Sequence, residues 1–153
     1  MTEDPALIAD TVRPPRVGFT GTRDGMTLAQ KVTVIALLRQ YAPVWVHHGD
    51  CVGADAEFHH AAQAVGAQVM IHPPSDPKLR AGLVGDDIAD EKPYLDRNRD
   101  IVHAADVLIA TPKETTGATK GGTWYTVKYA RKQGRKVVIV WPDGSTLIDG
   151  TSS

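Results

Sequence analysis

Cysteine is almost absent from this sequence, because Cys51 is the only one among 153 residues. A single cysteine excludes a disulfide within one chain and is typical of proteins from reducing compartments. The first ten residues lack the basic and apolar regions of a signal peptide, and no apolar run approaches the length of a membrane span. We therefore expect a cytoplasmic protein without a membrane partner.

An excess of charge of one sign is also missing. Lysine and arginine total 17, aspartate and glutamate total 18, and the formal net charge is −1. Without a global positive field, the chain is not expected to bind nucleic acid or an anionic membrane surface. Any binding of phosphate must therefore come from a local arrangement of donors.

Several ligand-binding motifs are absent as well. The sequence has no G-x-x-x-x-G-K-[ST] loop and no G-x-G-x-x-G turn, which argues against a P-loop NTPase and a standard dinucleotide dehydrogenase. Its six histidines include two adjacent pairs, His47-His48 and His59-His60. Neighbours in a strand point to opposite faces, and no H-E-x-x-H motif or cysteine cluster is present. We predict no metal and no cofactor.

What the sequence does contain is an alternation of two patterns. Short runs rich in β-branched residues suit strands that are buried on both faces. They occupy residues 17–20, 44–47, 68–71, 107–110 and 137–140. Helical patterns lie between them. This alternation predicts a Rossmann-like three-layer α/β/α sandwich with a mostly parallel sheet of about five strands.

Local signals mark the ends of the expected helices. Thr27 and Gln30 form a T-x-x-Q capping box. Gly66 is a plausible stop for the second helix, and Pro93 suits the first position of the third. Thr123 is expected to cap the fourth helix.

The length fits one domain. We expect an N-terminal tail over residues 1–15, a nucleotide-binding domain over 16–142 and a C-terminal tail over 143–153. The connection from 73 to 92 is long and rich in proline and aspartate. Loops of this length are often lids or binding loops, and a solvated surface loop is the equally weighted alternative.

Ligands of open α/β sheets bind beyond the carboxyl ends of the strands. Three of the four turns expected there are rich in glycine and lead into helices, where backbone N–H groups can approach a phosphate. Glycine also serves simply to turn the chain, so the pattern is suggestive rather than decisive. The candidate phosphate-binding residues in these turns are Gly21, Thr22, Arg23, His48, Gly49, Asp50, Gly53, Thr111, Lys120, Gly121, Gly122 and Thr123.

Four motifs in order resemble those of a known group. They are Gly21-Thr22-Arg23, then His48-Gly49 with Gly53-Ala54-Asp55, then Arg97-Asn98 ahead of Asp106, and finally Gly121-Gly122-Thr123. The chain is similar over residues 16–141 to the SLOG superfamily, the Rossmann-like fold shared by DprA and the LOG phosphoribohydrolases. The resemblance implies that the Gly-Gly-Thr turn holds a phosphate and that Arg97, with Asn98, reaches the nucleotide.

One departure from the LOG pattern bears on catalysis. LOG hydrolases cleave the N-glycosidic bond of a nucleoside 5′-monophosphate and carry a glutamate where this chain has Thr126. Cleavage needs a carboxylate near an oxocarbenium-like transition state, by analogy with glycosidases. Asp50, Asp55, Glu57 and Glu114 lie near the expected site edge. If the chain is a hydrolase, we expect Glu114 or Asp55 to be essential, with Arg97 beside them, and Cys51 to be dispensable.

Three functions remain open at this point. The first is a nucleotide-binding sensor or effector without chemistry of its own, which the missing glutamate favours. The second is a nucleotide N-glycosidase. The third is single-stranded DNA binding, through the resemblance of Arg97-Asn98-Arg99 to DprA, although the near-neutral charge argues against it. Trp124 and Tyr125 could stack on a base or pack in the core.

The resemblance also predicts the oligomeric state. Proteins of this fold commonly pair through helices, so we expect a homodimer. Light scattering at micromolar concentration should give twice the mass of the chain, and a monomer mass would refute the prediction.

Overall fold

The computed structural model describes residues 13–114 and 121–150. A seven-stranded sheet forms its middle layer, in the order β4-β3-β2-β1-β5-β6-β7. The strands are β1 Val17–Gly21, β2 Trp45–His48, β3 Gln68–Ile71, β4 Asp87–Ile88, β5 Val107–Thr111, β6 Lys136–Val140 and β7 Thr146–Asp149. All neighbours are parallel except β6 and β7. The predicted parallel pairing of the five apolar runs is confirmed.

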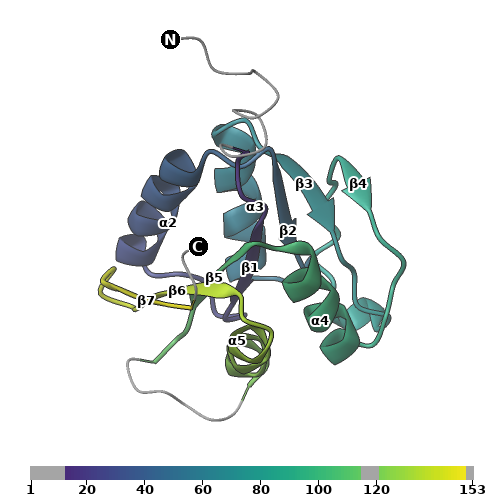
Figure 1. Ribbon diagram of the computed structural model, residues 1–153. Coiled ribbons are helices and arrows are strands. Elements are labelled where there is room, and N and C mark those ends of the chain that lie inside the picture. The colour runs from purple at the N-terminus through teal and green to yellow at the C-terminus, as the bar shows by residue number, and fades with distance from the viewer. Residues whose placement is uncertain (1–12, 115–120, 151–153) are drawn as a thin grey trace, which may run out of the picture.

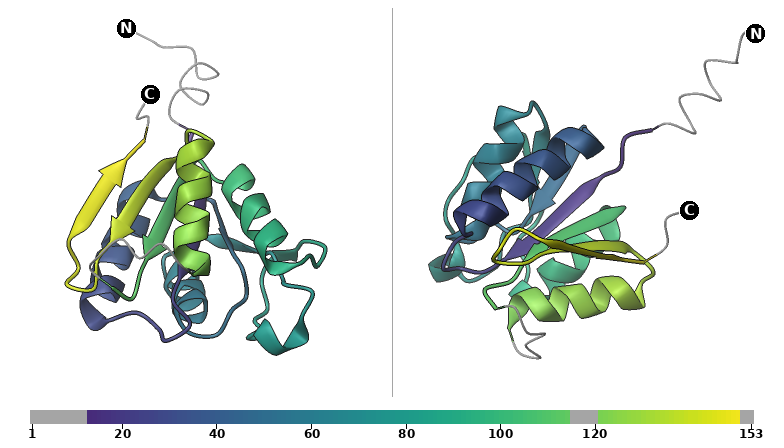
Figure 2. Two further views of the ribbon diagram at one scale, coloured as in Figure 1. Left: turned by 90° about the horizontal axis from the view of Figure 1, so that it is seen from below. Right: turned by 90° about the vertical axis from the view of Figure 1, so that its left-hand side faces the viewer.

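Helices cover both faces of the sheet (Figures 1 and 2). The helices are α2 Leu28–Tyr41, α3 Ala54–Ala64, α4 Tyr94–Ala104 and α5 Gly122–Lys132, with a short 3-10 helix η1 at Pro77–Leu79. One apolar cluster joins α2 and α3 to the sheet, and a second joins α4 and α5 to its other face. This arrangement confirms the Rossmann-like three-layer sandwich. No helix within the described ranges is both long and apolar enough to cross a membrane.

The capping box at the start of α2 is confirmed, and its residues also bond to other parts of the fold. The Gln30 amide N–H donates to the Thr27 hydroxyl at 3.0 Å, and the Thr27 N–H donates to the Gln30 side chain at 2.9 Å. The buried Gln30 side-chain NH₂ also donates to the carbonyls of Pro112 and Val140, both at 2.9 Å. These bonds tie the start of α2 to the chain that leaves β5 and β6.

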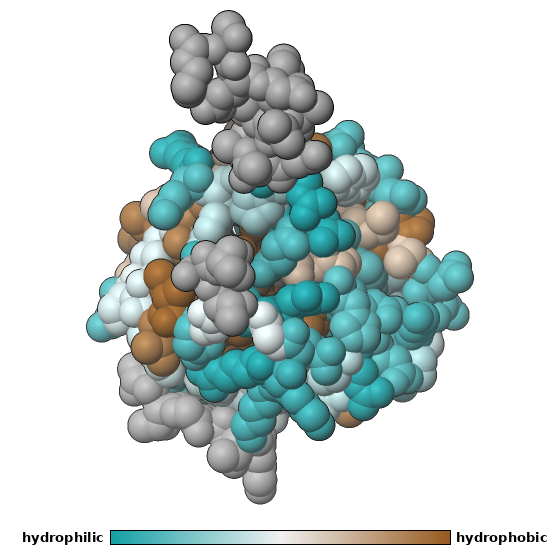
Figure 3. All heavy atoms as spheres, viewed as in Figure 1, coloured by the Kyte–Doolittle hydropathy of each residue, from teal (hydrophilic) through white to brown (hydrophobic). Residues whose placement is uncertain are grey.

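The end of the chain differs from the expectation. Residues 143–153 were expected to trail over the surface, but Thr146–Asp149 form β7, paired antiparallel to β6. The Asp149 carboxylate also accepts from Arg131 at 2.8 Å. On the mostly hydrophilic face in Figure 3, a smaller hydrophobic area lies on the side of β7, whose Leu147 and Ile148 are about half exposed. A four-residue edge strand next to glycine and aspartate gives little periodic signal.

Two helix starts also differ from the sequence reading. Pro93 is the N-cap of α4 rather than its first helical residue. Thr123 does not cap α5, because Gly121 is its N-cap and enters the helix with a φ of 104°. A positive φ is open to glycine without strain, so the chain turns into α5 with no capping side chain. The predicted stop at Gly66, with a φ of 85°, is confirmed just beyond α3.

The strand order places the crevice of the sheet. Successive connections run outward from β1 on one side and from β5 on the other, and β1 and β5 are neighbours over their whole length. Such a reversal leaves a crevice beyond the carboxyl ends of the two strands. At this edge Gly21 lets α3 approach, since a Cβ there would lie 2.6 Å from the Cβ of Ala54.

Candidate functional site

A cavity of about 350 Å³ opens at the carboxyl ends of β1 and β5, where the strand order reverses. Its walls come from the turn after β1, the loop between β2 and α3, and the starts of α4 and α5. The lining residues are Phe19, Thr20, Gly21, Thr22, Arg23, Gly49, Cys51, Asp55, Tyr94, Arg97, Asn98, Ile101, Pro112, Lys113, Glu114, Gly121, Gly122, Thr123 and Trp124.

Most of the residues predicted for the site line this cavity. Those brought together are Gly21, Thr22, Arg23, Gly49, Asp55, Arg97, Asn98, Glu114, Gly121, Gly122 and Thr123. Four others predicted to bind phosphate are not among the lining residues: His48, Asp50, Gly53 and Thr111. Lys120 lies outside the described residues.

The start of α5 forms one end of the cavity. Gly121 is the N-cap, none of the described side chains caps the helix, and its first turn holds no acidic residue. The first N–H groups of a helix lack partners within the helix and carry a partial positive charge. A Cβ on Gly122 would meet nothing closer than 3.7 Å, from Tyr94. The backbone at this point is therefore open to a ligand oxygen.

Arg23 lines the cavity from the turn after β1 and has an exposed side chain. Its guanidinium makes no hydrogen bond or ion pair with any described residue, whereas the neighbouring Asp24 pairs with Lys113 at 2.7 Å. Gly53 lets the loop before α3 pack closely against this turn, because a Cβ on it would overlap the Arg23 carbonyl. Gly53 therefore has a packing role, and its predicted ligand contact stays a prediction.

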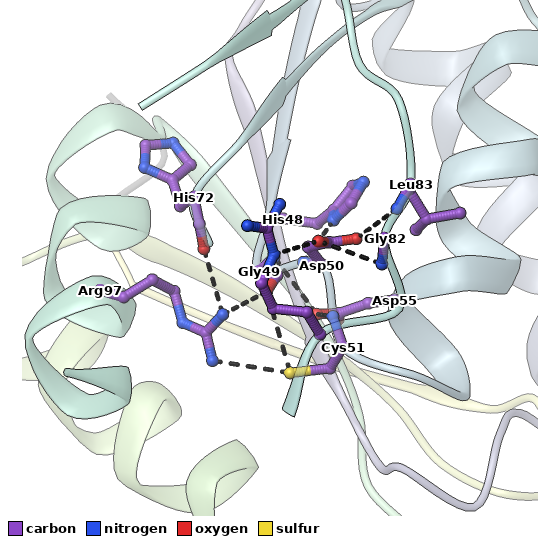
Figure 4. A network of polar contacts seen from close by, with 10 residues as sticks. His48, Gly49, Asp50, Cys51, Asp55, His72, Gly82, Leu83 and Arg97 are labelled. Atoms are coloured by element: carbon purple, nitrogen blue, oxygen red, sulfur yellow. Dashed lines mark hydrogen bonds and ion pairs between the residues drawn. The ribbon is translucent and has the colours of Figure 1, made fainter. Parts of the chain in front are cut away.

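Arg97 is 4% exposed, and its guanidinium bonds several segments of the chain at the cavity wall (Figure 4). Its Nη1 donates to the carbonyls of Gly49 and, at 3.1 Å, His72. Its Nε donates to the Asn98 Oδ1 at 2.7 Å, and Nη2 contacts the Cys51 sulfur at 3.6 Å. Arg97 therefore ties α4 to the chain that leaves β2 and β3.

Asp55 lies in the first turn of α3 and is 6% exposed. Its Oδ2 accepts from the backbone N–H groups of Gly49 at 3.2 Å and Cys51 at 3.1 Å. Burial raises the pKa of Asp55 to about 6, although these two backbone bonds and Arg97 oppose the shift. Burial also raises the pKa of the Cys51 thiol, which disfavours the thiolate needed for nucleophilic chemistry.

Asp50 was predicted to bind phosphate and instead anchors the long connection after β3. Its backbone has a φ of 57°, and its side chain points toward Gly82 and Leu83 (Figure 4). The buried carboxylate accepts from Arg80 Nε at 3.1 Å and from the N–H groups of Leu83 at 2.8 Å and Gly82 at 3.3 Å. No residue of 73–92 lines the cavity, so the connection is tied to the domain without covering the site.

The adjacent histidines point apart, as predicted, and each finds another histidine. His47 Nδ1 hydrogen-bonds His72 Nε2 at 2.9 Å. His48 Nδ1 accepts from the Asp50 N–H at 2.9 Å, so its Nε2 carries the proton and donates to His59 Nδ1 at 2.8 Å. His48 is fully buried. Its side chain therefore does not line the cavity, and its predicted contact with a ligand stays a prediction.

Burial makes these histidines neutral at pH 7. It lowers the pKa of His47 and of His72 to about 4 and that of His48 to about 3, although the nearby Asp100 opposes the shift at His72. The described part of the chain holds no group of three or more residues that could bind a metal ion.

The aromatic residues at the starts of α4 and α5 differ in their contacts. Trp124 is buried, lines the cavity and packs against Trp141 with ring centroids 6.0 Å apart. The Tyr125 hydroxyl accepts from Arg99 at 2.8 Å, on the α4 side of its helix. Sequence reasoning missed Tyr94, which lines the cavity. The only available signal was its place after Pro93, at the start of a helix that begins near the strand ends.

Comparisons with known proteins support the fold. No family model and no curated protein sequence matches the chain. Several solved structures do match. One is a structural-genomics target, TM1055, with 15% identity and a TM-score of 0.57 over 80% of this chain and 71% of that one. Another is DNA processing protein A (DprA) from Streptococcus pneumoniae, with 18% identity and a TM-score of 0.61 over 85% of this chain and 51% of that one. A further match is the molybdenum cofactor binding protein from the phototrophic bacterium Rippkaea orientalis, with 20% identity and a TM-score of 0.66 over 84% of this chain and 77% of that one.

These matches confirm the predicted Rossmann-like fold, which the chain shares with DprA. The chain spans about half of the DprA structure. Identities between 15% and 20% establish the fold and carry no activity over to this chain.

The histidine pairs predict how stability depends on pH. In the unfolded chain a histidine has a pKa of ~6.5. His47, His48 and His72 therefore bind protons in the unfolded chain as the pH falls below this value, whereas in the folded protein they are protonated only at about pH 4 or 3. Stability should therefore fall as the pH drops through this window. Asp55 opposes the trend, since its raised folded pKa favours the folded state as the pH falls through about 6.

Urea unfolding should show a free energy of unfolding at least ~3 kcal/mol lower at pH 4.5 than at pH 7, because three groups outweigh one. His72→Gln should flatten this dependence. His60→Gln, on an exposed residue of α3, is the matched control and should not. Equal stability of the wild type at both pH values would contradict the assignment.

Proposed function

We propose that the chain binds a phosphate-bearing nucleotide or nucleotide derivative in this cavity, as a sensor or effector domain without chemistry of its own. The observation that carries the proposal is the pairing of two donor groups on one cavity. The guanidinium of Arg23 has no bonded partner among the described residues, and the uncapped start of α5 lies on the same cavity. Both favour an anion.

The location of the cavity supports the same conclusion. It lies beyond the carboxyl ends of β1 and β5, where ligands of open α/β sheets bind. The net charge of −1 offers no global attraction for phosphate, so local donors would have to supply it. One matching structure of this fold is, by its name, a binding protein for the molybdenum cofactor, which supports a small-molecule ligand.

Two features argue against the other functions. Thr126, at the position of the LOG glutamate, is buried, and its hydroxyl donates to the Gly122 carbonyl within α5 at 2.8 Å. This position therefore supplies no carboxylate for glycosidic cleavage, and its hydroxyl is bonded within the helix. Arg97 is buried and bonded to backbone carbonyls, and Arg99 bonds Tyr125 and Asp96, so this run does not form an exposed basic stripe for single-stranded DNA.

A nucleotide N-glycosidase is the second candidate, and Asp55 is the observation that favours it. Asp55 lines the cavity, and its pKa of about 6 suits a group that exchanges protons near neutral pH. Its Oδ1 makes no hydrogen bond with the described residues, which leaves that oxygen for a ligand. Glu114 is a second cavity carboxylate.

Binding should depend on Arg23 through the phosphate. A charge-assisted contact contributes about 1.5–3 kcal/mol, so Arg23→Ala should weaken the binding of a nucleoside 5′-monophosphate by roughly ten- to a hundredfold. The matching nucleoside should be affected much less. Titration calorimetry of a panel of monophosphates and nucleosides measures both. Gly122→Val, which places carbon over the α5 start, should act in the same direction.

Arg39→Ala is the matched control, because Arg39 is exposed in the last turn of α2. It should leave binding unchanged. Equal losses for nucleotide and nucleoside in Arg23→Ala, or no loss for either, would place the phosphate elsewhere.

Incubation with each nucleoside monophosphate, followed by chromatography, separates the two candidates. We expect ligand-dependent shifts in melting temperature and no release of free base. Release of base would instead support the glycosidase. In that case the double variant Asp55→Asn, Glu114→Gln should lose all turnover, whereas Cys51→Ser should keep it.

A further inference from the structure

Asn98 is a nearly buried amide that faces the cavity. It lies on α4, is 8% exposed and lines the cavity beside the start of α5. A Cβ placed on Gly122 would lie 3.9 Å from the Asn98 Nδ2. The Nδ2 therefore sits next to the first residue of α5, where the helix N–H groups lack partners.

The orientation of this amide is fixed by Arg97. The Arg97 Nε donates to the Asn98 side chain at 2.7 Å. A guanidinium has donors and no acceptor, so the Asn98 atom that faces it must be the carbonyl oxygen. The NH₂ group must then lie on the other side of the amide, toward Gly122. It makes no hydrogen bond with any residue that the structure describes.

Arg97 itself has little freedom to turn toward a ligand. Its Nη1 is shared between the carbonyls of Gly49 and His72, which end two neighbouring strands. Gly49 has no side chain, and a Cβ there would overlap the guanidinium. The guanidinium is thus seated against the backbone, and its Nε is aimed at Asn98.

We propose that Asn98 donates its amide hydrogens to the phosphate of the ligand, and that Arg97 is a positioning residue which locks the amide in the donor orientation. This inference rests on the proposed function and deepens it. The Asn98 NH₂, the α5 N–H groups and the Arg23 guanidinium all donate and accept nothing. The subsite therefore selects an ionised phosphate oxygen over a hydroxyl or amino group that must donate.

Asn98→Asp tests the donor role directly. An aspartate keeps an oxygen for the Arg97 Nε, so the fold should persist, but it replaces the two donors with a carboxylate oxygen that repels phosphate. With inorganic phosphate and with nucleoside 5′-monophosphates as probes, calorimetry should show affinity at least tenfold weaker than wild type. Nucleoside binding and the melting temperature should not fall.

Gln63→Glu is the charge-matched control, since it adds the same negative charge at an exposed position of α3. It should bind phosphate like the wild type. If Asn98→Asp also binds like the wild type while Arg23→Ala weakens binding, this inference is overturned and the proposed function stands. If the wild type binds neither phosphate nor any monophosphate, both are overturned.

A double-mutant cycle tests the positioning role of Arg97. If Arg97 acts through Asn98, Arg97→Lys should weaken phosphate binding in the wild type and cost nothing further in the Asn98→Ala background. Additive losses would assign a direct ligand contact to Arg97 and overturn its positioning role. Should Arg97→Lys fail to fold, Asn98→Asp still decides the donor role, because it leaves Arg97 in place.

Discussion

The site depends on one constraint, which is that the buried guanidinium of Arg97 needs hydrogen-bond partners. A guanidinium removed from water is costly unless its donors are satisfied, and Arg97 finds backbone carbonyls and the Asn98 amide in place of a carboxylate partner. These bonds hold the start of α4 against the ends of β2 and β3. They also require glycine at position 49, where any Cβ would overlap the guanidinium.

The same need for partners explains how an acidic loop can border the proposed phosphate site. Asp50 is turned inward and paired with Arg80, so its charge is balanced on the far side of the loop. Asp55 accepts two backbone N–H bonds, and burial raises its pKa to about 6. The Asp50 charge is therefore paired away from the cavity, and two backbone N–H groups offset part of the Asp55 charge, so the donors at α5 and Arg23 are the groups that favour an anion.

The layers of the fold could be predicted from the sequence because the spacing of apolar residues differs between strands and helices, and the two patterns alternate along the chain. The capping box at Thr27 and the neighbouring β1 and β5 followed from local rules and topology. The short edge strands β4 and β7 gave too little periodicity. Motif order brought Arg23, Arg97 and Gly122 to one cavity, but it could not tell which side chains turn inward. Asp50 has a left-handed backbone, and that conformation leaves no mark on hydrophobic spacing.

Arg23 and Arg97 were both predicted to contact the ligand, and their different surroundings give them different roles. Arg97 already donates to the carbonyls of Gly49 and His72, so moving its guanidinium onto a phosphate would break these bonds and leave two carbonyls unpaired. Arg23 makes no such bonds with the described residues and lies exposed on the cavity, so it gains a contact without losing one. Affinity for an anion should thus come from Arg23 and the α5 backbone. The buried arginine contributes through preorganisation, because an amide held in one orientation gives up little freedom when the ligand arrives.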